Sequence, residues 1–222
     1  MQALSIASVA TPQLSERERD ELRSFLEGRW GAAGAGYFTS RLSRYRTLHT
    51  GRAGADFTCA MLTDSAARRG VAVHYVGPVF SARRSYLNLF VHWVTELTLA
   101  SAPFCVVAEV ETRRVERDMA SLLPAWIYPR PAVTTPSELY ALAQALPALF
   151  EHVHGVDRET LTSQVVEPLT PSPGRTRYQM LMLPCFGDFF APERLRQELT
   201  DGLRITARAR ARRTTPVLCS GS

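Results

Sequence analysis

Residues 71–110 constrain the fold most, because two apolar strands flank one apolar helix in this stretch. The segment 71–80 reads VAVHYVGPVF and the segment 104–110 reads FCVVAEV, and both patterns are typical of buried strands. Residues 86–100 are apolar almost all round the helix they predict, which indicates a helix packed in the core. This order predicts a parallel strand–helix–strand crossover, and therefore a mixed α/β (α+β) fold.

Gly77 and Pro78 interrupt the first of these strands. Proline cannot donate a ladder hydrogen bond, so we expect a bulge or a loss of strand pairing here. The strand then enters a polar turn, 81–85, directly before the helix. The first N–H groups of a helix lack partners within it, so this turn is a candidate phosphate-binding site.

The other segments predict further helices and strands around this central unit. Before it we expect a capped helix from Ser15 to near Gly28, a loop at 31–36, strands at 45–49 and 57–62 joined by a turn at 50–54, and another turn at 64–70. After it we expect a helix at 114–123, a capped helix at 136–153 kinked at Pro147, strands at 164–169 and 178–184, and a last helix from Pro192.

A chain of 222 residues suits one domain of this kind. We predict a flexible lead at 1–14, a single domain at 15–203 with a mixed central sheet flanked by helices, and an arginine-rich tail at 204–222. The helical insertion, about 131–163, precedes the last two strands.

Charge and cysteine content exclude several classes of protein. All 26 basic residues are arginine, and five of them lie in the tail, so the rest of the chain has no net charge. Nucleic acid is therefore the least favoured partner. The four scattered cysteines form no CxxC pair, which indicates neither a zinc site nor a disulfide scaffold. With no apolar run long enough for a bilayer and no signal-peptide pattern, we expect a cytoplasmic protein without a membrane partner.

The central unit resembles the GCN5-related N-acetyltransferase (GNAT) superfamily, and the resemblance covers roughly residues 15–130. In that family a bulged strand enters a loop of pattern Arg/Gln-x-x-Gly-x-Gly/Ala, which holds the pyrophosphate of coenzyme A at a helix N-terminus. The resemblance implies that strand 104–110 diverges from strand 71–80 and that pantetheine lies in the gap. Segment 126–131, WIYPRP, and the helix after it are similar to a subgroup with a helical insertion.

The resemblance implies acetyl-CoA or another acyl-CoA as the thioester substrate, with no metal. The chain departs from the pattern because Tyr86 and Asn88 occupy the glycine and glycine/alanine positions, although Arg83 and Arg84 would offer phosphate contacts instead. Glu116 stands where many members carry a tyrosine. The candidate cofactor-binding residues are Val79, Phe80, Ser81, Arg83, Arg84, Ser85, Tyr86 and Asn88.

Acyl transfer to an amine needs a base for the ammonium and an acid for the leaving thiolate. Glu109 and Glu111 are two residues apart, so both point to one face and either would serve as base. His74 is a second candidate base, and Tyr128 a candidate acid. The alternatives are strand-end carboxylates in salt bridges, a histidine packed in the sheet, and an interface aromatic.

We therefore expect an N-acyltransferase that moves an acyl group from coenzyme A to a small-molecule amine. A close alternative uses an acyl carrier protein as donor, docked by the basic tail, or catalyses another thioester reaction. Two further alternatives are a non-catalytic interaction or regulatory module and nucleic-acid binding through the tail. A homodimer is left open.

Overall fold

A single seven-stranded sheet organises the chain in the computed structural model, which describes residues 4–82, 85–110, 112–130, 132–157, 159–164 and 177–214 (side chains of 177 and 206–214 excepted). The strand order is β1-β2-β3-β4-β5-β7-β6. The strands are β1 (Leu4–Ala10), β2 (Thr47–Ala53), β3 (Asp56–Arg68), β4 (Val71–Ser81), β5 (Phe104–Val110), β6 (Thr162–Gln164) and β7 (Arg177–Cys185).

Of these neighbouring strands, β4 and β5 pair in parallel and the other pairs are antiparallel. The connection between β4 and β5 is the helix α2, so the predicted crossover and the predicted mixed α/β fold are confirmed. The helices are α1 (Glu16–Thr39), α2 (Ser85–Leu99), α3 (Arg113–Leu122), α4 (Ser137–Ala143), α5 (Leu146–Leu149) and α6 (Pro192–Thr214), with short 3₁₀ turns at Thr11–Gln13 and Gly187–Phe189.

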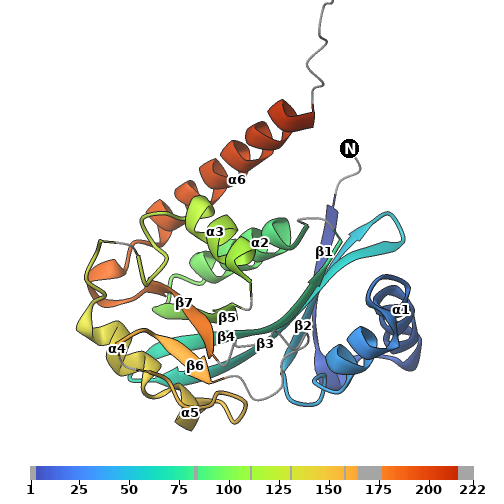
Figure 1. Ribbon diagram of the computed structural model, residues 1–222, viewed down its shortest axis with the longest axis horizontal. Helices are drawn as coiled ribbons and strands as arrows, with labels where there is room; N and C mark the ends of the chain where they lie inside the picture. Colours follow the sequence, from blue (N-terminus) through green and yellow to red (C-terminus); the bar gives the residue numbers. More distant parts are fainter. Residues whose placement is uncertain are drawn as a thin grey trace, which may run out of the picture.

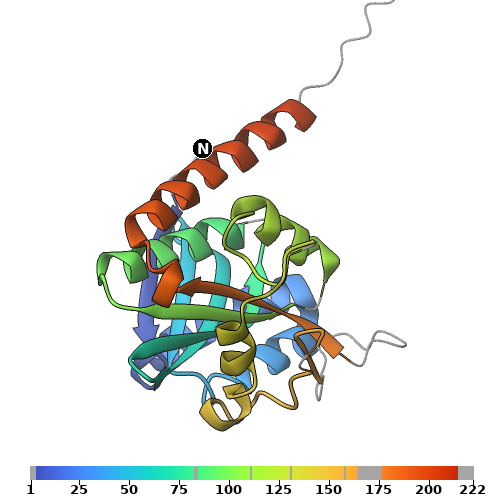
Figure 2. The same ribbon diagram turned by 90° about the vertical axis from the view of Figure 1, so that its left-hand side faces the viewer.

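The helices cover the two faces of the sheet in two groups (Figures 1 and 2). On one face α1, α4 and α5 enclose a core that includes Phe38, Tyr75 and Leu146. On the other face α2, α3 and α6 enclose a second core that includes Trp93 and Leu199. Residues that alternate along each strand therefore contribute to two different interiors.

The N-terminal segment is a strand, which corrects the expectation of a flexible lead at 1–14. Strand β1 pairs with β2 from Leu4 opposite Ala53 to Ala10 opposite Thr47. Its residues are at best half-buried, so the alternation of apolar side chains is weak. The free backbone edge of β2, rather than a strong pattern in the segment itself, decides its conformation.

The glycine-rich segment 31–36 was expected to be a loop but belongs to α1, which is kinked at Gly31. Gly31, with φ of 70°, is the one residue inside α1 with non-helical angles. A Cβ on Gly34 would lie 2.5 Å from the Trp30 Cβ, so a small residue is needed there. The end of α1 buries Ala35 and Phe38, and this burial outweighs the low helix propensity of glycine.

The β2–β3 hairpin is confirmed, but its turn lies later than 50–54, because β2 continues to Ala53 and β3 begins at Asp56. The expected turn at 64–70 is also wrong. Strand β3 continues to Arg68, and Arg69 and Gly70 form the turn, both with positive φ.

The inserted segment breaks into α4 and α5 where Pro147 was expected to kink a single helix. Leu139, Leu142 and Leu146 pack into the core beneath the sheet. Strand β6 was predicted at 164–169 and occupies Thr162–Gln164, while 165–176 lie outside the described residues. Helix α6 continues through Thr214, well into the expected tail, and its C-terminal half projects from the body of the domain (Figure 1).

Candidate active site

Strands β4 and β5 separate halfway along their length. They pair from Ala72 opposite Phe104 to Val76 opposite Ala108, and no β4–β5 pair follows. At the same point the register of β3 against β4 shifts, because Thr63 pairs with Val76 whereas Met61 pairs with Val79. The bulge that Gly77 and Pro78 predict is thus confirmed, and it turns the end of β4 away from β5.

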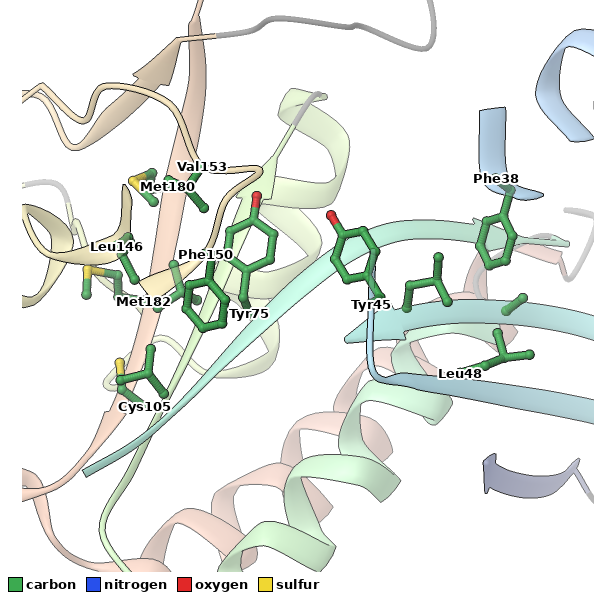
Figure 3. Packing of buried hydrophobic residues seen from close by; sticks show 14 of the residues in the cluster. Phe38, Tyr45, Leu48, Tyr75, Cys105, Leu146, Phe150, Val153, Met180 and Met182 are labelled. Atoms are coloured by element: carbon green, nitrogen blue, oxygen red, sulfur yellow. The ribbon is translucent and has the colours of Figure 1, made fainter. Parts of the chain in front are cut away.

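A tyrosine ring covers the bulge. A Cβ added to Gly77 would lie 2.2 Å from the ring of Tyr45, so only glycine lets this ring rest on the strand. The Tyr45 ring is stacked with the Tyr75 ring at 6.4 Å between centroids, and Phe150 lies on the other side of Tyr75 at 5.4 Å. Figure 3 shows the Phe150 ring next to that of Tyr75, with Tyr45 on the other side of Tyr75.

Glu109 is the first β5 residue beyond the paired region, and it lies on the same face as Tyr75. Its Oε1 atom is buried and has no hydrogen-bond partner among the described residues, and the same holds for Ser163 Oγ. Burial raises the pKa of the Glu109 carboxyl, while the nearby hydroxyls of Ser163 and Tyr75 lower it less. A carboxylate with a raised pKa and a free oxygen is suited to accept a proton.

His152 lies within the same aromatic cluster. Its ring centroid is 4.6 Å from that of Tyr45 and 4.7 Å from that of Tyr75. Burial lowers the pKa of His152 to about 4, so the ring is neutral at pH 7. Its Nε2 atom is buried and without a partner in the described part of the chain. The cluster therefore combines apolar rings with several unpaired polar atoms.

The burial of these rings also affects the tyrosines. Burial and the nearby Glu109 carboxylate raise the pKa of both Tyr45 and Tyr75. Both phenols therefore stay protonated at neutral pH and can donate a hydrogen bond or a proton. Tyr75 and its neighbour His74 point to opposite faces of β4, and the structure places Tyr75, not His74, on the side of Glu109.

His74 points to the other face of the sheet. Its ring lies 5.9 Å from that of Trp93 and 6.3 Å from that of Phe104, both edge-on. Burial lowers the pKa of His74. Because successive residues of a strand alternate between faces, His74 and Glu109 belong to different interiors. This geometry matches the alternative of a histidine packed in the sheet.

Tyr128 is buried and lies beside β7, where its backbone exchanges two hydrogen bonds with Met182. Its hydroxyl accepts a hydrogen bond from Arg130 Nη2, and the Arg130 guanidinium lies 4.4 Å above its ring. This environment favours the packed interface aromatic. Glu111 lies outside the described residues.

Backbone amides in the turn before α2 and in the first turn of α2 already donate hydrogen bonds within the protein. Ala82 N–H donates to Thr58 O at 2.7 Å, and Tyr86 N–H donates to Ser81 Oγ at 3.0 Å. Ser85 N–H donates to Ala82 O at 3.4 Å, and the Ser85 hydroxyl lies 2.9 Å from that of Ser81. These amides are therefore not free for a phosphate. Arg83 and Arg84 lie outside the described residues.

The other predicted cofactor residues have varied surroundings. Phe80 is buried against Trp30 and Phe38, whereas Val79 is 39% exposed and Asn88 is exposed. The Tyr86 hydroxyl donates to Asp118 Oδ2 at 2.7 Å and ties α2 to α3. Val79 and Asn88 are accessible to a ligand, whereas Phe80 packs in the core.

Three other features bear on function. Among the described residues no group of three or more His, Cys, Asp or Glu side chains could hold a metal ion. In the same residues no helix is long and apolar enough to cross a bilayer. A surface pocket of about 560 Å³ lies on α4, lined by Ser137, Tyr140, Ala141, Gln144 and Glu159, and includes none of the candidate residues.

The fold brings three residues to the candidate site that the sequence did not indicate there: Tyr45, His152 and Ser163. Tyr45 was expected only as the start of a strand and His152 only as part of the helix at 136–153, and Ser163 lies before the strand predicted at 164–169. The approach of His152 and Ser163 to Glu109 depends on the path of the inserted segment over the sheet, and the place of Tyr45 depends on its packing against Gly77. No spacing in the sequence encodes either.

No family model matches this chain, and no curated protein is similar to it. Solved structures similar to it include the ribosomal-protein-S18-alanine N-acetyltransferase from Escherichia coli, with 14% identity and a TM-score of 0.43 over 82% of this chain and 94% of that chain. The IAA acetyltransferase from Bacillus cereus is 8% identical, with a TM-score of 0.41 over 82% of this chain and 99% of that chain. A GNAT family acetyltransferase from Brucella melitensis in complex with acetyl-CoA is 12% identical, with a TM-score of 0.36 over 53% of this chain and 82% of that chain. These structures belong to acetyltransferases, and one carries the name of the family that the sequence resembles.

Proposed function

We propose that the protein is an N-acyltransferase that moves an acyl group, most simply acetyl, from a phosphopantetheine thioester to the amine of a small molecule. The observation that carries this proposal is the Glu109 carboxyl at the point where β4 and β5 separate, because its Oε1 atom is buried without a hydrogen-bond partner among the described residues. Burying a carboxylate oxygen without a partner is costly, so such a group is more readily explained by chemistry than by stability.

In the proposed reaction Glu109 takes a proton from the substrate ammonium, and the proton then passes to solvent. The amine nitrogen attacks the thioester carbonyl carbon, so that a C–N bond forms and the C–S bond breaks. The thiolate leaves and receives the second proton of the amine, either directly or through Tyr75 or Tyr45, whose phenols stay protonated. The amide and the free thiol are the products.

The pH dependence of this reaction follows from the raised pKa of Glu109. The base works only when ionised, so kcat/KM is expected to rise as the pH passes through a value above the usual range of a glutamate. This limb of the pH profile should vanish in Glu109→Gln, because an amide does not titrate.

The experiment combines binding with turnover. Calorimetric titration with acetyl-CoA, and with free coenzyme A as the control, measures thioester binding. Release of free thiol in the presence of a panel of amines measures transfer. Transfer that depends on both thioester and amine supports the proposal, and transfer of equal rate in Glu109→Gln contradicts the role of the carboxylate.

A second candidate is a non-catalytic interaction or regulatory module. The engaged amides of Ala82, Ser85 and Tyr86 favour it, because a diphosphate would have to displace internal hydrogen bonds. A folded protein that binds neither acetyl-CoA nor coenzyme A and transfers nothing supports this module. The variant Arg83→Ala with Arg84→Ala tests whether those two arginines contribute, since unchanged thioester affinity would exclude them from a phosphate cradle.

A further inference from the structure

We propose that the acyl donor is carried by an acidic acyl carrier protein, which docks on the projecting half of α6. The inference rests on the proposed function, and it names the donor for the same site. Two independent features carry it. One is the hydrogen bonding of the turn before α2, and the other is the charge and place of the end of α6.

The turn before α2 is poorly suited to coenzyme A. A coenzyme A thioester presents a diphosphate and a further phosphate on its ribose, and a helix N-terminus binds such groups through free N–H donors. Here the Tyr86 and Ser85 amides, which belong to the first turn of α2, already donate to Ser81 Oγ and Ala82 O. A carrier-bound phosphopantetheine has a single phosphodiester, so it needs fewer of these donors.

The C-terminal part of the chain, including the end of α6, accounts for the net positive charge of the protein. From Gly202 to Ser222 the sequence contains five arginines and no acidic residue, whereas the first part of α6 includes Glu193, Glu198 and Asp201. Four of those arginines, at positions 208, 210, 212 and 213, lie within α6 beyond the segment that packs on the domain. Gly202 and Leu203 still pack on the domain, since a Cβ at Gly202 would meet Leu122 O at 2.3 Å and Leu203 lies against the second core.

This basic end lies on the side of the domain where the thioester is expected. Helices α2 and α6 pack against one another and run in opposite directions (Figure 1), so the C-terminal half of α6 extends past the side on which α2 begins. The β4–β5 opening lies at the end of β4, which leads directly into α2. A protein bound to the end of α6 would therefore be placed beside the opening that its pantetheine arm must enter.

The composition of this helix favours a protein partner over nucleic acid. Ile205 is 63% exposed and lies in sequence between Arg204 and Arg208, which gives the surface an apolar centre at its base. The segment 202–214 contains no aromatic residue, so it offers no platform for stacking bases. Opposite charges around an apolar contact are the usual arrangement for docking two proteins that meet transiently.

The test compares donors and charge variants. A bacterial acyl carrier protein loaded with acetyl-phosphopantetheine, its apo form and acetyl-CoA are titrated into the full chain by calorimetry at 50 and 300 mM salt. We expect the loaded carrier to bind at least ~10-fold more tightly than acetyl-CoA, with an affinity that falls as salt rises. The apo carrier should retain part of this affinity, because the docking contact does not need the arm.

The charge reversal Arg208→Glu with Arg212→Glu should weaken carrier binding at least ~10-fold, since it places four units of charge change on the docking helix. The matched control is Arg23→Glu with Arg29→Glu, which makes the same charge change at exposed positions of α1 on the other face. The control should bind the carrier as the native chain does. Circular dichroism and thermal unfolding verify that both variants fold.

Each result has a defined meaning. Equal carrier binding by the two charge variants, or acetyl-CoA binding as tight as that of the loaded carrier, overturns the docking proposal. Tighter binding of a random-sequence DNA duplex than of the carrier also overturns it. Amine transfer from acetyl-CoA without transfer from the carrier leaves the acyltransferase standing and removes only the carrier, whereas transfer from neither donor removes the proposed function itself.

Discussion

Two buried groups of polar side chains on opposite faces of the sheet differ in how well they are satisfied. On the α2 face His49 is 3% exposed and has a hydrogen bond on each ring nitrogen, to Ser8 Oγ at 2.7 Å and Thr63 Oγ1 at 2.8 Å. On the α1 face Glu109 Oε1 and His152 Nε2 are buried without partners among the described residues.

The difference separates structure from function. A buried polar group that is fully hydrogen-bonded fixes β1, β2 and β3 in register at little cost, whereas an unpartnered one lowers stability by about 1–3 kcal/mol. Such a cost is expected where a site must meet a substrate. His49 therefore belongs to the scaffold, and Glu109 to the candidate site.

The largest expected effect is that of a change at Glu109, whose Oε1 has no hydrogen-bond partner among the described residues. Glu109→Gln should lower kcat/KM by about 10²- to 10⁴-fold, which is the usual contribution of a general base. The same variant should be at least as stable as the native protein at pH 7, because it removes a buried charge. Steady-state kinetics and urea unfolding measure the two effects. A large loss of stability with retained activity would reverse the assignment of the two groups.

On the α2 face, where both ring nitrogens of His49 are hydrogen-bonded, His49→Leu should lower the free energy of unfolding by about 2–3 kcal/mol, since Thr63 Oγ1 loses its partner in a buried position. Activity per folded molecule should stay the same, because His49 lies on the face opposite Glu109. Urea unfolding followed by fluorescence, together with kinetics at a temperature where the variant is folded, distinguishes the two. A stable variant would show that the hydrogen bonds to His49 contribute little.

Gly77→Ala tests whether the Tyr45 ring must rest on the bulge. The added Cβ would clash with the ring, so we expect a loss of about 1–3 kcal/mol in the free energy of unfolding, the range typical of overpacking. A rise in KM should accompany it if displaced Tyr45 disturbs the site. The double variant Gly77→Ala with Tyr45→Leu should recover part of the lost stability. No recovery would place the strain elsewhere in the bulge.

The smallest effect at neutral pH is expected for His152→Phe. The change removes the unpartnered Nε2 but adds a larger ring among Tyr45, Tyr75 and Phe150, so the two effects offset and stability should change by less than about 1 kcal/mol. Its effect grows in acid. The folded pKa of His152 is about 4, below the usual 6.5, so the unfolded chain binds more protons between these values. Stability present above pH 6.5 is therefore lost as the pH falls toward 4, by up to roughly 3 kcal/mol for this group.

His152→Phe should remove that part of the acid sensitivity, which urea unfolding at pH 7 and at pH 5 would show. His49, with a folded pKa lowered to about 4 by burial, should keep its own share in this variant. Glu109 acts in the opposite sense, because its raised pKa makes its contribution fall as the pH rises through the folded value. An unchanged acid slope in His152→Phe would mean that His152 does not stay neutral in the fold.

Elements with a strong apolar pattern in their own sequence were predictable, whereas elements whose conformation depends on contacts with other segments were not. The segments 71–80 and 104–110 carry enough apolar character to form strands in many contexts, and Gly77-Pro78 marked the bulge directly. Strand β1 and the second half of α1 were missed, because their short or glycine-rich sequences favour no single structure locally. Strand β1 owes its conformation to pairing with the edge of β2, and the second half of α1 owes its conformation to the burial of Ala35 and Phe38.

The candidate site was predictable only in part, for a related reason. Glu109 could be chosen because a carboxylate at the end of an apolar strand is unusual. Its neighbours come from segments far apart in the chain: Tyr45 lies before β2, His152 after α5 and Ser163 in β6. Nothing in their local sequence indicates that they meet. His74 had a suitable chemistry, but the twofold alternation of β4 sends it to the other face.

The sequence by itself determined the order of the elements, the bulge in β4, the parallel crossover and the concentration of arginine at the C-terminus, because each depends on residues adjacent in the chain. The tertiary structure decided which polar groups are left without partners, which amides of the α2 turn are already engaged, and on which side of the domain the arginine-bearing helix projects. These depend on contacts between distant segments, and only the packing of the two faces of the sheet brings those segments together.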